Sequence, residues 1–221
     1  ISAARRLAEA GLFKLKLYLM IGLPSETGDD LEEFLQLVRK IRAEIDPVGR
    51  KKGRLCEITV SVNSFVPKPW TPFQYHPFGM AQRLEDNDTV TGETAVRTMK
   101  RKIRQLREGL KEVDNTRINF DRPDHVLFQA VLARGDRRLA EVLLEIAASG
   151  ISWRQALKKH GLSEELFATR QYDNQSKMAW EIIDHSIDPS YLWKEYLRAF
   201  QGKETVPCDT EICRRCGVCD V

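Results

Sequence analysis

The stretch from Leu15 to Thr27, with the sequence LKLYLMIGLPSET, constrains the fold more than any other part of the chain. Its residues alternate in character, with Leu15, Leu17, Leu19 and Ile21 on one face and Lys16, Tyr18 and Met20 on the other. This period of two predicts a β-strand that buries one face. Gly22 permits a sharp bend or a close approach to a ligand, and Pro24 cannot continue the strand.

A helix is predicted directly after this turn. Thr27 is a favourable N-cap residue, and Asp29 and Asp30 suit the first turn of a helix. Apolar residues then recur at helical spacing over about four turns, and we expect a loop from Asp46 to Arg54. Ligands of α/β proteins bind where strands end and helices begin, so the turn is a candidate site, although an ordinary corner without a ligand explains it equally well.

A second strand is predicted from Leu55 to about Phe65. Ile58, Val60 and Val62 alternate with Glu57, Thr59, Ser61 and Asn63. The two strands and the intervening helix fit a right-handed βαβ unit with parallel strands. The polar face suits either the interior of a barrel that holds a ligand or a solvent-exposed sheet face.

The segment from Val62 to Phe73 is a structured loop, because it holds three prolines within six residues. Asn63, Phe65, Trp70 and Phe73 offer amide and stacking contacts for a ligand. The alternative is that the aromatic residues only cap the end of the sheet.

Two motifs in this region point to a known family. The GLPSET turn, followed one helix later by VNSFVPKPWTPFQ, resembles the late βα units of radical S-adenosylmethionine (radical SAM) enzymes, and most closely the multidomain group with an N-terminal cobalamin-binding domain. The resemblance is good over residues 1–120 and looser beyond. It implies an α/β fold, with the final βα units of a partial (β/α)6, TIM-like barrel followed by a mostly helical domain and a Cys-rich tail.

The resemblance also implies cofactors and binding residues. It makes the Gly22 turn the end of the fifth barrel strand and Asn63 the end of the sixth, where both would contact S-adenosylmethionine (SAM). The implied cofactor-binding residues are Gly22, Leu23, Pro24, Glu26, Asn63, Phe65 and Val66. A [4Fe-4S] cluster belongs to the catalytic centre of this family, and cobalamin would be held by an N-terminal domain. Gly22→Val is expected to block SAM and to keep the fold if φ at Gly22 is negative.

One departure from the family pattern is decisive for activity. No Cys-x3-Cys-x2-Cys motif occurs in the chain, so the catalytic cluster would be ligated elsewhere and the chain alone is expected to be inactive. The chain opens at Ile1 on what reads as the end of a helix, which predicts a missing N-terminal part of the same protein as its partner. No catalytic residue, substrate or oligomeric state is assigned.

Four cysteines in the tail form a second strong signal. Cys208, Cys213, Cys216 and Cys219 lie within twelve residues, and Cys56 is the only other cysteine. Such spacing allows thiolates to converge on one metal ion or cluster. The pattern predicts a metal-binding tail that holds either zinc or an iron-sulfur cluster. His125, His160 and His185 lack ligand-like spacing and are expected to be structural.

A basic helix is predicted from about Thr91. Val96, Met99, Ile103, Leu106 and Leu110 form its apolar seam, and Arg97, Lys100, Arg101, Lys102, Arg104 and Arg107 occupy the remaining surface. This surface either binds phosphates, with RNA among the partners it allows, or is simply solvated. The alternative function for the whole chain is therefore a metal-binding module for RNA or protein interaction.

Composition sets the outer limits. The chain has 221 residues and a net charge of +3, and it lacks an apolar run long enough to span a membrane. A cytoplasmic protein without membrane partners is expected. The predicted domains are the barrel part at 1–80, a connector with the basic helix and an edge strand at 81–122, a helical domain at 123–200 and the tail at 201–221.

Overall fold

The computed structural model describes residues 1–85 and 87–219. Asp86, Asp220 and Val221, which belong to the predicted connector and tail, lie outside the described residues. The chain forms two compact units. The sheet unit comprises residues 1–65 and 97–123, and the helical unit comprises residues 66–96 and those from 124 onward. Both units are therefore built from two separate stretches of sequence.

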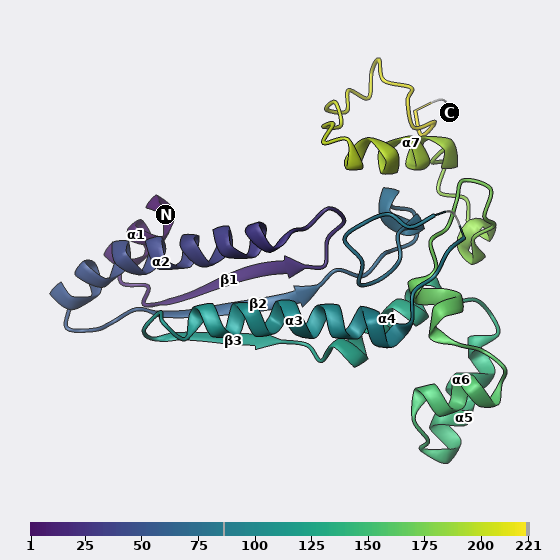
Figure 1. Cartoon of the computed structure of the whole chain (residues 1–221). Coiled ribbons are helices and arrows are strands. Elements are labelled where there is room, and N and C mark those ends of the chain that lie inside the picture. Colours follow the sequence, from purple (N-terminus) through teal and green to yellow (C-terminus); the bar gives the residue numbers. More distant parts are fainter. Residues whose placement is uncertain (86, 220–221) are drawn as a thin grey trace. The chain divides into compact units, whose positions relative to one another are not determined.

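A three-stranded parallel sheet forms the centre of the sheet unit (Figure 1). Its strands are β1 (Lys14–Ile21), β2 (Glu57–Ser64) and β3 (Thr116–Phe120), in the order β1-β2-β3. Leu17 pairs with Val60, and Val60 pairs in turn with Ile118. The predicted α/β class, the parallel pairing of the first two strands and the short edge strand are confirmed.

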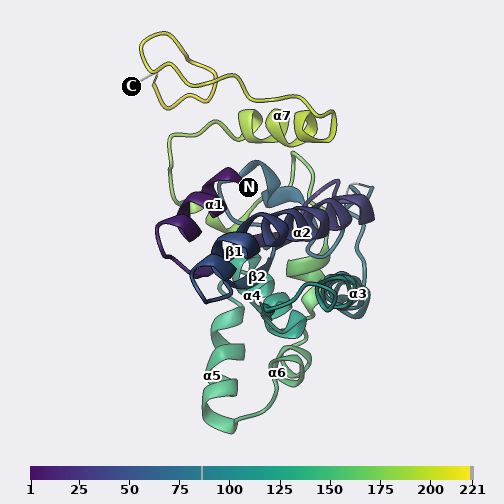
Figure 2. The same ribbon diagram turned by 90° about the vertical axis from the view of Figure 1, so that its left-hand side faces the viewer.

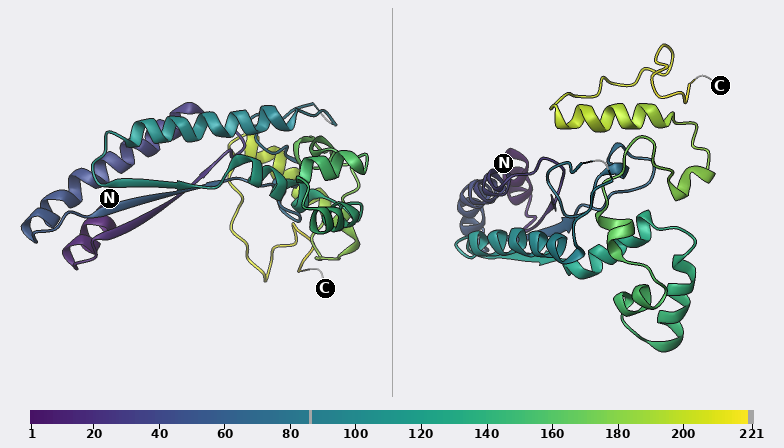
Figure 3. Two further views of the ribbon diagram at one scale, coloured as in Figure 1. Left: turned by 90° about the horizontal axis from the view of Figure 1, so that it is seen from below. Right: turned by 45° about the vertical axis from the view of Figure 1, so that its right-hand side comes forward.

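Three helices accompany the sheet: α1 (Ser2–Glu9), α2 (Gly28–Lys51) and α3 (Gly92–Leu110). Figure 3 shows α2 and α3 over the same face of the sheet, and in Figure 2 α1 lies beside α2. The side chains of Leu15, Ile21, Ile58, Val60 and Val62 are buried on the helical side. The five predicted seam residues of α3 are all buried, so the period of the apolar residues identified the buried side of this helix correctly.

The opposite face of the sheet is exposed. Tyr18 and Met20 of β1 are 68% and 48% exposed, and Asn63 of β2 and Asn119 of β3 are exposed as well. This face therefore carries amide and other polar side chains that no described element of the sheet unit covers.

Helix α2 runs further than predicted. We expected a loop from Asp46, because proline disfavours the interior of a helix, but Pro47 lies inside the last turns of α2. Ile45 and Gly49 are buried on either side of it, and Arg42 forms an ion pair with Asp46 at 3.0 Å. These contacts offset the hydrogen bond that proline cannot donate. The helix ends instead before Gly53, whose φ of +68° suits the residue after a helix end.

The helical unit consists of short helices. They are η1 (Pro72–Tyr75), α4 (Pro123–Arg134, in this unit from Asp124), α5 (Leu139–Ser149), α6 (Trp153–Lys159), η2 (Glu165–Thr169), η3 (Ala179–Ile182) and α7 (Pro189–Phe200). Ser152 caps α6, because its side chain accepts a hydrogen bond from the backbone N–H of Gln155. Among the described residues, no helix combines the length and the apolar content needed to cross a membrane.

Aromatic residues form one core of this unit. Tyr75, Met178, Trp180, Leu192 and Tyr196 are buried together, and Trp193 and Leu197 pack against them. Two apolar residues of neighbouring segments are not part of a core. Ile183 is 54% exposed and Leu143 of α5 is 43% exposed, whereas Trp180 and Val142 of the same segments are buried.

Candidate functional site

The carboxylate of Glu26 holds the Gly22 turn in its conformation. Glu26 Oε2 accepts hydrogen bonds from the backbone N–H of Gly22 at 2.8 Å and of Leu23 at 3.4 Å. Its other oxygen, Oε1, pairs with the ammonium of Lys102 on α3, and both side chains are buried. The hydrogen-bonding capacity of Glu26 is therefore used to fix the turn. The prediction that Lys102 belongs to the surface of the basic helix is wrong, because this partner 76 positions away draws it inward.

Gly22 is required by conformation and by packing. Its φ is +80°, a backbone region that side chains disfavour. A Cβ atom at this position would lie 2.5 Å from Cε of Met99, which is buried in α3. The condition of a negative φ, under which Gly22→Val was expected to keep the fold, is not met. The side chain of Met99 fills the space beside Gly22. This packing agrees with the alternative that the turn is an ordinary corner without a ligand.

The two predicted strand ends lie side by side. Met20 pairs with Asn63 and Ile21 pairs with Ser64, and the backbone N–H of Phe65 donates to the carbonyl of Ile21 at 2.8 Å. The Gly22 turn and Asn63 thus share the carboxyl edge of the parallel sheet. Asn63 is exposed on the open face, whereas Leu23, Pro24 and Phe65 are partly buried.

The remaining residues of the predicted binding loop belong to the helical unit. Val66 is buried there. Trp70 and Phe73 pack against its aromatic core. Gln74 Oε1 accepts hydrogen bonds from the backbone N–H of Trp70 and from the indole N–H of Trp180, both at 2.9 Å. Trp70 and Phe73 therefore stabilise the helical unit itself. This agrees with the alternative in which the aromatic residues have a structural role and contact no ligand.

The cysteine tail folds back near α7. The backbone N–H of Asp188 donates to the carbonyl of Cys216 at 2.8 Å, and Arg215 donates to the carbonyl of Val206 at 2.9 Å. Nε of Arg215 also lies 3.3 Å from Sγ of Cys213. Gly217 has a φ of +84° and makes the turn between the last two cysteines.

The four tail thiols influence one another electrostatically. Loss of hydration and the negative charges of the other three tail cysteines raise the pKa of Cys208. Hydrogen bonds from the backbone and side chain of Arg215 lower the pKa of Cys213. Within residues 1–85 and 87–219, however, no three side chains of His, Cys, Asp or Glu are grouped closely enough to hold a metal ion. The donor set suits zinc or an iron-sulfur cluster, but the loop would have to close around it.

Two polar side chains, a histidine and an arginine, are buried in the helical unit. His76 is fully buried, and its ring contacts the Tyr196 hydroxyl at 3.1 Å and the carbonyl of Met80 at 2.8 Å. Arg134 is 2% exposed and donates to the carbonyls of His76, Ala168 and Arg170 at 2.8–2.9 Å. In the sequence these two residues look like ordinary surface residues. Their burial distinguishes them, and a sequence does not show it.

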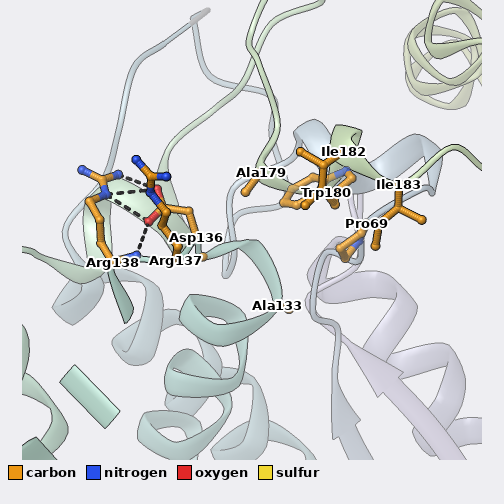
Figure 4. Close-up of a pocket in the computed structure, with 10 residues that line it drawn as sticks. Pro69, Ala133, Asp136, Arg137, Arg138, Ala179, Trp180, Ile182 and Ile183 are labelled. Atoms are coloured by element: carbon orange, nitrogen blue, oxygen red, sulfur yellow. Dashed lines mark hydrogen bonds and ion pairs between the residues drawn. The ribbon is translucent and has the colours of Figure 1, made fainter. Parts of the chain in front are cut away.

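A cavity of about 690 Å³ lies in the helical unit (Figure 4). One side is apolar and includes Trp180 and the exposed Ile182 and Ile183. The other side carries Asp136 and Arg138, which form a bidentate pair with contacts of 2.7–3.0 Å. Asp136 neutralises Arg138, so Arg137 leaves one positive charge on this side, and a single charge does not single out a ligand.

A basic groove of about 450 Å³ lies in the sheet unit, between α3 and the end of β3. Its cationic lining residues are Lys100, Arg104, Arg107, Lys111 and Arg122. Glu108 is the one acidic side chain among its described lining residues.

Comparisons with known proteins give one relative without an assigned function. An uncharacterized protein of Methanocaldococcus jannaschii is 31% identical to the chain over 155 residues. The aligned region covers 70% of this chain and 28% of the relative, so the chain spans less than a third of the length of that protein. No protein-family model matches the sequence, and no solved structure matches it at a significant level.

Proposed function

We propose that the chain is the C-terminal part of a radical SAM enzyme, in which β1 and β2 are the last two strands of the partial (β/α)6 barrel. One observation carries the proposal: the Gly22 turn and Asn63 lie at the same edge of two paired parallel strands. Such an edge is where α/β proteins hold their ligands. The exposed polar face of the sheet supports the same reading, because the interior of a ligand-binding barrel needs polar side chains.

On this proposal the residues of the chain bind and orient SAM. The backbone beside Gly22, held in place by the Glu26 carboxylate, would contact the ligand at one strand end, and the Asn63 amide would contact it at the next. Leu23, Pro24 and Phe65 remain predicted contacts. A [4Fe-4S] cluster on a Cys-x3-Cys-x2-Cys motif outside this sequence would supply the redox chemistry that cleaves SAM, and methyl or group transfer with cobalamin is one reaction the resemblance allows.

Two experiments test the proposal. The coding region upstream of Ile1 should encode a Cys-x3-Cys-x2-Cys motif, and its absence would favour the interaction module instead. In the longer protein, reconstituted with iron and sulfide, Asn63→Ala should weaken SAM binding about tenfold, because one hydrogen bond to the ligand is lost. Isothermal calorimetry provides the measurement.

A matched control lies on the same face of the sheet. Asn119 of β3 is also exposed and sits one strand further from β1, so Asn119→Ala should leave SAM affinity unchanged. Equal effects of the two substitutions, or no effect of either, would contradict the placement of SAM at the ends of β1 and β2.

A further inference from the structure

The basic groove between α3 and the end of β3 has no role in the proposed SAM site. Its cations come largely from one helix face, since Lys100, Arg104 and Arg107 are spaced by four and three residues. From the first to the third of these, the row is about 10 Å long at 1.5 Å per residue. Lys111 and Arg122 extend the positive lining beyond it. The row is therefore longer than a single phosphate group.

Most of these charges lack a carboxylate partner. Within the described chain, Arg104, Arg107, Lys111 and Arg122 form no ion pair and donate no side-chain hydrogen bond. Like charges held near one another repel, and helix neighbours of the same sign destabilise the helix. An anionic ligand with several charges would remove this repulsion. The position of Lys102 makes the contrast clear, because that lysine of the same helix is buried and paired with Glu26.

An aromatic side chain stands in the same groove. Phe120 at the end of β3 is 38% exposed, and the guanidinium of Arg107 lies 5.8 Å from the centre of its ring. Single-stranded nucleic acids bind to proteins through this combination of a positive groove and aromatic rings on which bases stack. A simple phosphate or a polyphosphate would make no use of the ring.

We propose that this groove binds a single-stranded polynucleotide, with the cations of α3 on its phosphates and Phe120 beneath a base. The proposal does not depend on SAM or on the tail metal. RNA and DNA share the chemistry that the groove recognises, and the test separates them.

The test measures binding of fluorescent 20-residue oligo(U), oligo(dT) and a duplex by anisotropy at several salt concentrations, with polyphosphate as a charge-only competitor. The single strands should bind more tightly than the duplex. Arg104→Gln combined with Arg107→Gln should lower the affinity roughly tenfold or more, and should reduce the salt slope by about 1.4, at about 0.7 for each phosphate contact. A tighter complex with oligo(U) than with oligo(dT) identifies RNA as the ligand, and the reverse order identifies DNA; either order supports the groove.

A second variant separates base stacking from charge. Phe120→Leu should weaken single-strand binding about tenfold and leave competition by polyphosphate unchanged. The control, Arg137→Gln combined with Lys158→Gln, removes two exposed charges from the helical unit and should change affinity less than twofold. Circular dichroism verifies the fold of each variant.

Two results would overturn the proposal. A control that weakens binding as much as the groove variant would mean that any positive surface suffices. If Phe120→Leu bound single strands as tightly as the parent chain, the groove would be a general anion site that does not stack bases.

Discussion

His76 shows how burial changes the chemistry of a single residue. Burial lowers the pKa of its imidazole from the ordinary value of 6.5 to about 4. The positive charge of Arg134 acts in the same direction, and the hydrogen bond to the carbonyl of Met80 opposes it. The ring is therefore neutral in the folded helical unit at pH values where an unfolded chain would already be protonated.

This difference predicts a loss of stability in mild acid. Because the pKa is lower in the folded state, the contribution of His76 is fully present above pH 6.5 and is lost as the pH falls toward 4. At 1.36 kcal/mol per pKa unit the full contribution is about 3 kcal/mol, and about 2 kcal/mol should be lost between pH 7.5 and pH 5. Urea unfolding followed by tryptophan fluorescence measures it, because Trp70, Trp153, Trp180 and Trp193 all belong to the helical unit.

The matched variants are His76→Gln and His160→Gln. The first removes the buried titrating group, so its stability should differ less between the two pH values. His160 is exposed, and its replacement should leave the pH dependence as it is in the parent chain. A His76→Gln variant with an unchanged pH dependence would contradict the assignment.

Gly22 carries the second prediction at this scale. Gly22→Ala should destabilise the sheet unit by about 2–3 kcal/mol, of which roughly 1 kcal/mol comes from the positive φ and the rest from the clash with Met99. Hydrogen exchange of peptides from β1 and α3 measures the loss locally. In a Met99→Ala background the added cost of Gly22→Ala should fall to about 1 kcal/mol, because the clash is gone.

Gly11 is the control for conformation alone. Its φ is +89°, and no atom lies within 4 Å of the position that a Cβ would take. Gly11→Ala should therefore cost only about 1 kcal/mol. Equal costs at Gly11 and Gly22 would show that the contact with Met99 does not restrict the turn.

At the scale of elements, the parts that follow a simple period were predictable from sequence. The alternation from Leu15 to Ile21 identified β1 and its buried face, and the three- and four-residue steps from Val96 to Leu110 identified the buried side of α3. These patterns depend on neighbours in sequence alone. The end of α2 was not predictable in this way, because Pro47 is tolerated only through the buried contacts of Ile45 and Gly49.

Only part of the candidate site was predictable from sequence. The shared edge of the Gly22 turn and Asn63 was predicted, because parallel strands joined by a helix end at the same side of a sheet. The hydrogen bonds by which Glu26 fixes the turn were not predicted, since its partner Lys102 is remote in sequence. The burial of Arg134 was missed for the same reason, because the three carbonyls that accept its hydrogen bonds come from two other segments of the chain.

At the scale of the whole molecule, the distribution of cysteines is uneven. Four of the five lie in the tail, and Cys56 is fully buried in the sheet unit. We predict that the tail loop closes around a metal when one is supplied. Protein purified without oxygen should then contain about one zinc ion or about four iron atoms per chain, as four thiolates require.

Cysteine substitutions locate that metal. Cys213→Ser and Cys216→Ser should each abolish most of the metal content, because a closed site needs all four ligands, whereas Cys56→Ala should leave it unchanged. Metal analysis and alkylation with iodoacetamide provide the two measurements. In the loaded protein the four tail thiols should resist alkylation, and a chelator should make them reactive without exposing Cys56, which stays buried as long as the sheet unit is folded. Free alkylation of all four tail thiols together with no bound metal would leave the tail as a loop fixed only by Arg215 and by its contact with Asp188.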